Sequence, residues 1–154
     1  MFFKKIDVSE FQFDIPTNSP TNEGGISDEP DNPTLVAQIT FDCLKPGDLI
    51  WLNSIFHVNN DNVFDITVFH SILKNNIPIY SAVTEVDREG NDDFGQIFSQ
   101  QYVDVVTTLE KNIIYQVVAS IEGHANIDSS FPNVNLVGPI TFTGTRFVKG
   151  KKWV

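Results

Sequence analysis

The chain of 154 residues carries 20 acidic and 10 basic side chains, which gives a net charge of −10 at pH 7. This charge opposes contact with phosphate backbones and anionic lipid, so nucleic acid is not expected as a partner. No run of residues approaches the ~20 apolar positions needed to span a membrane, so membrane insertion is not expected either. The length fits one domain that folds by hydrophobic burial, without a metal or disulfide.

The N-terminal 33 residues have the pattern of an arm followed by a linker. The start, MFFKKIDVSEFQF, lacks the apolar core of a classical secretion signal, so we expect synthesis without a signal peptide. Phe11, Phe13 and Ile15 alternate with polar residues, as in a short strand without a sheet of its own. Residues 16–33 contain four prolines, and their single aliphatic side chain is Ile26. Such a segment is expected to be an extended, flexible linker.

From residue 34 onward, short apolar runs of β-type composition alternate with turn residues. The predicted strands cover residues 34–44, 50–58, 64–73, 77–86, 95–108 (as one or two strands), 113–121 and 136–148. The predicted turns and loops cover residues 45–48, 59–62, 74–76, 87–93, 110–112 and 122–132. Seven or eight strands in one domain predict an all-β antiparallel sandwich or barrel over residues 34–154.

The single cysteine and the three histidines do not suggest a catalytic or metal site. Cys43 continues the strand-like run of residues 34–44, and we interpret it as an inert, buried thiol. If residues 50–58 and 64–73 formed a hairpin centred on Asp61, His57 and His70 would project from opposite faces. We therefore interpret His57, His70 and His124 as structural residues.

The densest cluster of carboxylates lies in the predicted loop after residue 84. It consists of Glu85, Asp87, Glu89, Asp92 and Asp93. Oxygen-rich loops of this kind attract calcium, but the spacing does not match the twelve-residue calcium-loop pattern. We interpret the cluster as a solvated acidic loop, with a weak calcium site as the alternative.

None of the common catalytic or phosphate-binding sequence motifs occurs in the chain. The protein is therefore not expected to be an enzyme, and no cofactor is expected. A glycosidase-like pair of carboxylates in a cleft would not be visible in the sequence.

The charges at the two ends of the chain are opposite. Residues 6–31 contain acidic but no basic side chains, whereas four basic residues lie among the last nine: Arg146, Lys149, Lys151 and Lys152. This distribution favours either contact between chains or docking of the arm on its own domain. The alternative is that both ends are solvated tails.

We expect a homo-oligomer in which Phe11, Phe13 and Ile15 complete a sheet edge of a neighbouring subunit. Docking of the arm within its own chain is the competing possibility.

Five segments between residues 34 and 148 resemble a known family pattern. They read TLVAQITF, PGDLIWLNSIFHV, FDITVFHSILKNNIPIYS, TLEKNIIYQVVASIEG and GPITFTGTRF. Their order is similar to that of jelly-roll subunits on the surface of spore-forming Gram-positive bacteria, the endospore appendage and exosporium proteins, which share the C1q and tumour necrosis factor fold. The paired cysteines of disulfide-linked appendage subunits are absent here.

This resemblance implies a jelly-roll sandwich of about eight strands that serves as a structural subunit of a surface filament or layer. It also implies a location on the spore or cell surface, with other surface-layer proteins as further partners. Two alternatives remain open: a trimeric binding module for carbohydrate or protein, and a phage virion protein of the same fold. Fold analogy cannot choose among them, because this architecture carries many functions.

Overall fold

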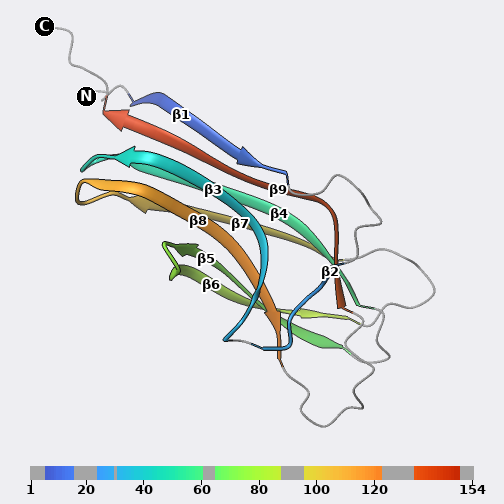
Figure 1. Cartoon of the computed structure of the whole chain (residues 1–154). Helices are drawn as coiled ribbons and strands as arrows, with labels where there is room; N and C mark the ends of the chain where they lie inside the picture. Colours follow the sequence, from blue (N-terminus) through green and yellow to red (C-terminus); the bar gives the residue numbers. More distant parts are fainter. Residues whose placement is uncertain are drawn as a thin grey trace, which may run out of the picture.

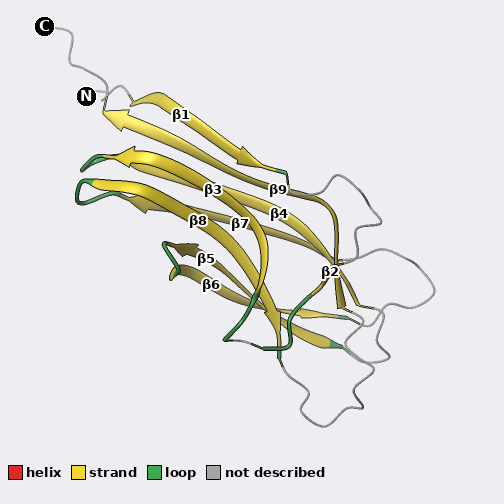
Figure 2. Ribbon diagram, viewed as in Figure 1, coloured by secondary structure: helices red, strands yellow, loops and turns green. Residues whose placement is uncertain are grey.

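The computed structural model describes residues 6–15, 24–29, 31–60, 65–87, 96–122 and 134–149. Within these ranges the chain forms strands and no helix (Figure 2). The strands are β1 (Ile6–Asp14), β2 (Gly24–Gly25), β3 (Thr34–Leu44), β4 (Leu49–Asn60), β5 (Ile66–Lys74), β6 (Ile77–Val86), β7 (Gln96–Val105), β8 (Glu110–Ile121) and β9 (Val134–Lys149). The all-β prediction is confirmed.

The strands form two sheets, and all pairings between named strands are antiparallel (Figure 1). One sheet has the order β1-β9-β4-β7, with the short β2 paired to β9, and the other has the order β3-β8-β5-β6. Consecutive strands therefore cross repeatedly from one sheet to the other. Apart from the added β2, this is the topology of an antiparallel jelly roll, in which two sheets enclose one core.

The core lies between the sheets and is built largely by alternation of inward and outward side chains along the strands. In β4, Ile50, Leu52, Phe56 and Val58 point inward and are fully buried. The other sheet contributes Tyr115 of β8 and Phe41 of β3, whose rings meet edge-on with 6.0 Å between the centroids. Each fully buried side chain of this size contributes roughly 1.5–3 kcal/mol to the free energy of unfolding.

Part of the predicted arm belongs to the sandwich, which corrects the expectation that its apolar strip has no partner strand in its own chain. β1 pairs with β9 from Ile6, opposite Lys149, to Asp14, opposite Phe142. Figure 1 shows the two strands side by side at one edge of the sheet. This pairing could not be predicted from the sequence, because the two strands lie far apart along the chain and a local pattern indicates a strand but not its partner.

Residues 24–29 correct the prediction of a flexible linker. Ile26 is buried, its backbone N–H donates to the carbonyl of Val134, and the carbonyl of Ser27 accepts from the N–H of Ile121. The segment thus links β9 of one sheet to β8 of the other. Its single aliphatic side chain anchors it in the core, so the sandwich includes residues before position 34.

The turn at residues 74–76 is confirmed as the β5–β6 hairpin. Asn75 and Asn76 adopt positive φ angles of 49° and 65°, a conformation that asparagine tolerates better than most residues. By contrast, the turn expected at residues 110–112 lies inside β8.

The hairpin considered for residues 50–73 does not form. β4 pairs with β7 and β9, whereas β5 pairs with β6 and β8, so His57 and His70 lie in different sheets. The alternation along β3 is interrupted by a bulge between Leu35 and Ala37, and Leu35 is exposed. One side chain of this strand differs from the sequence prediction. Cys43 is a free thiol and is half-buried rather than buried, since it lies near the end of this edge strand.

Candidate interaction surface

The outer face of the β1-β9-β4-β7 sheet carries large apolar side chains that point away from the core. We call it the outer apolar face. It comprises Val8, Phe11, Phe13, Trp51, Ile55, Ile97, Val103, Val105 and Phe147, all of them exposed except the half-buried Phe147. These residues alternate with the inward-pointing core residues of the same strands, so apolar side chains occupy both faces of the sheet.

The register of the four strands joins these side chains into continuous rows. Phe11 lies opposite Thr145, which lies opposite Trp51, and Trp51 lies opposite Val103. The next row consists of Val8, Phe147, Leu49 and Val105. Because directly opposed residues of antiparallel strands share a face, each row crosses the whole sheet. Phe11, Trp51 and Val103 are 56%, 43% and 50% exposed, so the band is open to solvent along its length.

The row that begins at Phe13 is otherwise polar, and it is also uncharged. Phe13 lies opposite Thr143, and the row continues through Asn53 to Gln101. None of the residues in these three rows is ionisable, although the chain as a whole has a net charge of −10. The acidic residues of β1 lie at the alternate positions, which face the other way. These three rows therefore form an uncharged, largely apolar band on an acidic protein.

In β1 the apolar side chains face solvent and the acidic side chains face the other sheet, which is the reverse of an ordinary edge strand. Its apolar residues Phe11 and Phe13 are exposed, and their rings stack with centroids 6.1 Å apart. Its inward side presents Glu10 and Asp14, and Asp14 Oδ2 accepts a hydrogen bond of 2.8 Å from the backbone N–H of Gln38 in β3. Backbone pairing and polar contacts therefore hold β1, with no apolar contribution to the core.

Arg146, one of the predicted interface residues, makes its contacts within the chain. Its guanidinium lies between Asp48, with Nη2–Oδ2 at 2.6 Å, and Glu10, with Nη1–Oε2 at 3.4 Å. The acidic arm thus meets the basic C-terminal strand of the same chain at this point. Ile15, another predicted interface residue, is exposed just beyond β1. Lys151 and Lys152 lie outside the described residues, and for Lys149 only the backbone pairing with Ile6 is described.

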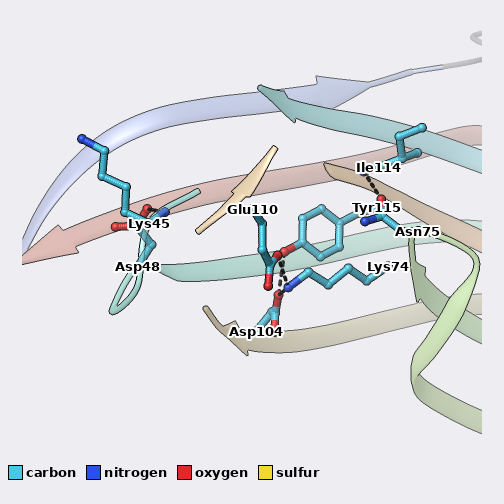
Figure 3. Close-up of polar contacts among 8 residues, drawn as sticks. All are labelled: Lys45, Asp48, Lys74, Asn75, Asp104, Glu110, Ile114 and Tyr115. Carbon is cyan, nitrogen blue, oxygen red and sulfur yellow. Dashed lines mark hydrogen bonds and ion pairs between the residues drawn. The ribbon is translucent and has the colours of Figure 1, made fainter. Parts of the chain in front are cut away.

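A second group of polar side chains joins the two sheets at the end of the sandwich (Figure 3). Lys74 Nζ lies 2.8 Å from Asp104 Oδ2 and 2.7 Å from Glu110 Oε2. The hydroxyl of Tyr115 donates a hydrogen bond of 2.6 Å to Asp104 Oδ2. We call these four residues the Lys74 cluster. Three strands position them: β5, β7 and β8.

The charges of the Lys74 cluster are set by burial and by the close contacts. Burial lowers the pKa of Lys74, but its hydrogen bond to Asp104 and its ion pair with Glu110 outweigh this effect and raise the pKa above its usual value. Burial, followed by the hydrogen bond to Asp104, raises the pKa of the Tyr115 hydroxyl. The tyrosine therefore keeps its proton and remains a donor to the carboxylate.

The histidines do not come together in one site. His70 is buried between the sheets, with Nε2 at 3.1 Å from Thr84 Oγ1 and its ring edge-on to Phe98. Burial lowers the pKa of His70, an effect partly opposed by the side chain of Gln100. His57 is half-buried in the other sheet, and His124 lies outside the described residues.

The acidic loop considered for calcium is described only in part. Glu85 and Asp87 are exposed near the end of β6, whereas Glu89, Asp92 and Asp93 lie outside the described residues. In the part of the chain that the structure covers, no three histidine, cysteine or carboxylate side chains form a group suited to a metal ion.

Comparison with known proteins adds little to this picture. No protein-family model and no curated protein matches the chain. Among solved structures, the chain is similar to a cycloisomaltooligosaccharide glucanotransferase of Paenibacillus sp., crystallised with cycloisomaltoheptaose. The identity is 12% and the TM-score 0.30, over 96% of this chain but 18% of that enzyme. This likeness supports no inference about function.

The described residues include no helix long and apolar enough to cross a membrane.

Proposed function

We propose that this protein is a non-enzymatic structural subunit that self-assembles into a surface filament or layer through its outer apolar face. The observation that supports this function is the uncharged band of exposed apolar side chains that crosses all four strands of one sheet. Monomeric proteins rarely expose contiguous apolar patches larger than a few hundred Å2, and larger patches mark interaction surfaces.

The charge of the chain favours a second copy as the occupant of this face. Two copies with a net charge of −10 repel one another over most orientations. The repulsion is weakest where uncharged surfaces meet, and burial of Phe11, Trp51 and Val103 there supplies the attraction. Added salt screens the repulsion, so association through this face strengthens at higher ionic strength. Head-to-tail pairing of charged termini would weaken under the same conditions.

The first strand also supports exchange between subunits. β1 contributes no buried apolar side chain, and its anchors are the ladder with β9, the Glu10–Arg146 ion pair and the contact of Asp14 with β3. A β1 strand from a neighbouring copy makes the same contacts, because exchanged elements reproduce the interactions of the closed subunit. In this proposal, β1 links neighbouring subunits, which is the role expected for the N-terminal arm. The assembly belongs to a spore or cell surface, where other surface-layer proteins are further partners.

Two valines on the outer faces of different sheets provide a matched test. Val103 on β7 belongs to the outer apolar face, whereas Val83 on β6 is 59% exposed on the outer side of the other sheet. Val103→Glu places a charge in the band and is expected to abolish assembly in sedimentation velocity, with no effect on folding by circular dichroism. Val83→Glu is expected to assemble like the wild type. Equal behaviour of the two variants would contradict the proposal.

Electron micrographs of the purified protein identify the form of the assembly. Filaments or sheets are the expected result. Discrete trimers would instead favour the trimeric binding module for carbohydrate or protein, and would overturn the proposed filament or layer.

A further inference from the structure

The Lys74 cluster contains an amine in contact with two carboxylates, at a point where the sheets face each other. Lys74 is the last residue of β5 in one sheet, Asp104 lies on β7 in the other, and Glu110 is the first residue of β8. The Nζ atom lies 2.8 Å from Asp104 Oδ2 and 2.7 Å from Glu110 Oε2 (Figure 3). The three functional groups of an amide-forming reaction, an amine, an acyl group and a proton carrier, are thus in contact.

The surroundings shelter this contact and orient the acyl group. The side chains of Lys74, Asp104 and Glu110 are 16%, 13% and 21% exposed. The buried ring of Tyr115 lies 5.9 Å from Lys74 Nζ, and its hydroxyl donates to Asp104 Oδ2. A donor fixed on this oxygen stabilises the negative charge that develops on the carboxyl group when an amine attacks its carbon.

We propose that Lys74 and Asp104 condense to form an intramolecular isopeptide bond that links the two sheets, with Glu110 as the proton carrier. The Nζ atom attacks Cγ of Asp104, the C–N bond forms, and one C–O bond of the carboxyl group breaks. Of the three protons on the ammonium, one stays on the amide nitrogen and two leave with the carboxyl oxygen as water. Glu110 takes these two protons from Nζ one after the other and passes each to the departing oxygen, so it is unchanged at the end.

The same contacts limit the rate of this reaction. The two carboxylates hold Lys74 as an ammonium, which is not nucleophilic, so attack requires transfer of a proton to Glu110 across their 2.7 Å contact. The bond therefore forms once per chain, as a maturation step that is complete in the purified protein. The product needs no cofactor, and it is independent of whether the chain assembles with other copies.

Among the residues that the structure describes, two other contacts of basic residues with carboxylates illustrate what the reaction requires. Arg146 lies between Asp48 and Glu10, but a guanidinium is always protonated and is not a nucleophile. Lys45 meets Asp48 through its backbone N–H, while its ammonium group points away (Figure 3). These residues provide internal controls for the specificity of the reaction.

Intact-mass spectrometry of the purified full-length chain tests the proposal directly. The expected mass is lower than the sequence mass by one water molecule. Trypsin does not cleave after an acylated lysine, so the expected digest retains Lys74 uncleaved and joined to the segment of residues 89–111. A chain of full mass that is cleaved normally after Lys74 would overturn the proposal. Loss of water located at any other position would also overturn it.

Three variants separate the roles of the residues. Lys74→Arg keeps a cation beside both carboxylates but cannot form the bond, and Glu110→Gln keeps the size of the side chain but removes the proton carrier. Both are expected to have the full mass calculated from their sequences. Lys45→Arg is expected to lose one water, as the wild type does. Loss of water from Lys74→Arg would contradict the assignment of the amine, and loss from Glu110→Gln would contradict the role of Glu110.

Discussion

Glu10 of β1 and Arg146 of β9 occupy directly paired positions in the ladder, with 3.4 Å between Oε2 and Nη1. Arg146 also contacts the carboxylate of Asp48, whose side chain is 7% exposed. The arginine therefore connects the first strand to a buried carboxylate beside the β3–β4 turn. This relationship explains why part of the acidic N-terminal segment lies on its own domain.

The two acidic partners of Arg146 differ in burial, so its two ion pairs contribute differently to stability. Arg146→Met leaves Asp48 buried without its cation and is expected to lower the free energy of unfolding by about 3 kcal/mol. Glu10→Gln changes a carboxylate that is 30% exposed, and the expected loss is below about 1 kcal/mol. Urea denaturation of both variants measures the difference. Equal losses would show that Arg146 does not stabilise the fold through Asp48.

Gly144 on β9 is required by close packing against the other sheet. A Cβ atom at this position would lie 2.5 Å from Cδ1 of Ile39 and 3.0 Å from the ring of Phe41. Gly144→Ala is therefore expected to lower the free energy of unfolding by about 1–3 kcal/mol. Ile39→Val removes the nearest methyl group, so the same alanine substitution is expected to be less destabilising in that background. A double-mutant cycle with no coupling between positions 39 and 144 would refute this packing relationship.

Stability is expected to depend on pH through His70. Burial lowers the pKa of His70 in the folded state, an effect partly opposed by Gln100, so between the folded pKa and about 6.5 the unfolded chain binds more protons. The stabilisation from neutral His70 is fully present above pH 6.5 and is lost as the pH falls toward the folded pKa. We predict a smaller decrease in stability below pH 6.5 for His70→Gln than for the wild type. His57→Gln serves as the control, and an unchanged pH profile in His70→Gln would contradict the assignment.

Exchange of β1 between subunits is testable by a covalent lock. Phe11 and Thr145 are directly paired, so cysteines at both positions can form a disulfide that fixes β1 on its own β9. In a Cys43→Ala background, the oxidised Phe11→Cys, Thr145→Cys protein is expected to assemble less than the same protein in its reduced form, so the loss of the Phe11 ring affects both samples equally. Equal assembly of the oxidised and reduced forms would rule out strand exchange. The proposed contact through the outer apolar face would remain testable by the valine variants.

The sequence predicts most strands but few of their partners. Residues 34–44, 77–86, 113–121 and 136–148 fall within or close to observed strands, because alternation and turn residues are local signals. The partners of β4 are β7 and β9, which lie more than thirty residues away in the sequence, and no local pattern identifies them. The same limitation hid the pairing of β1.

For the candidate sites too, the sequence indicates single side chains but not which of them the fold brings together. The exposed strip of Phe11 and Phe13 is visible in the sequence, whereas Trp51 and Val103 look like ordinary strand residues until the register places them beside it. Runs such as LIWL, with apolar residues on both faces of a strand, are the signal that could have indicated an outer apolar face. The Lys74 cluster draws its members from three strands, so their contact depends on the folded topology.

Sedimentation velocity of the intact chain over a range of protein and salt concentrations tests the central claim most directly. We predict a species heavier than one chain, whose share increases with protein concentration and with salt, because salt screens the repulsion between acidic copies. A single chain at every concentration, or association that weakens as salt is added, would contradict assembly through the outer apolar face.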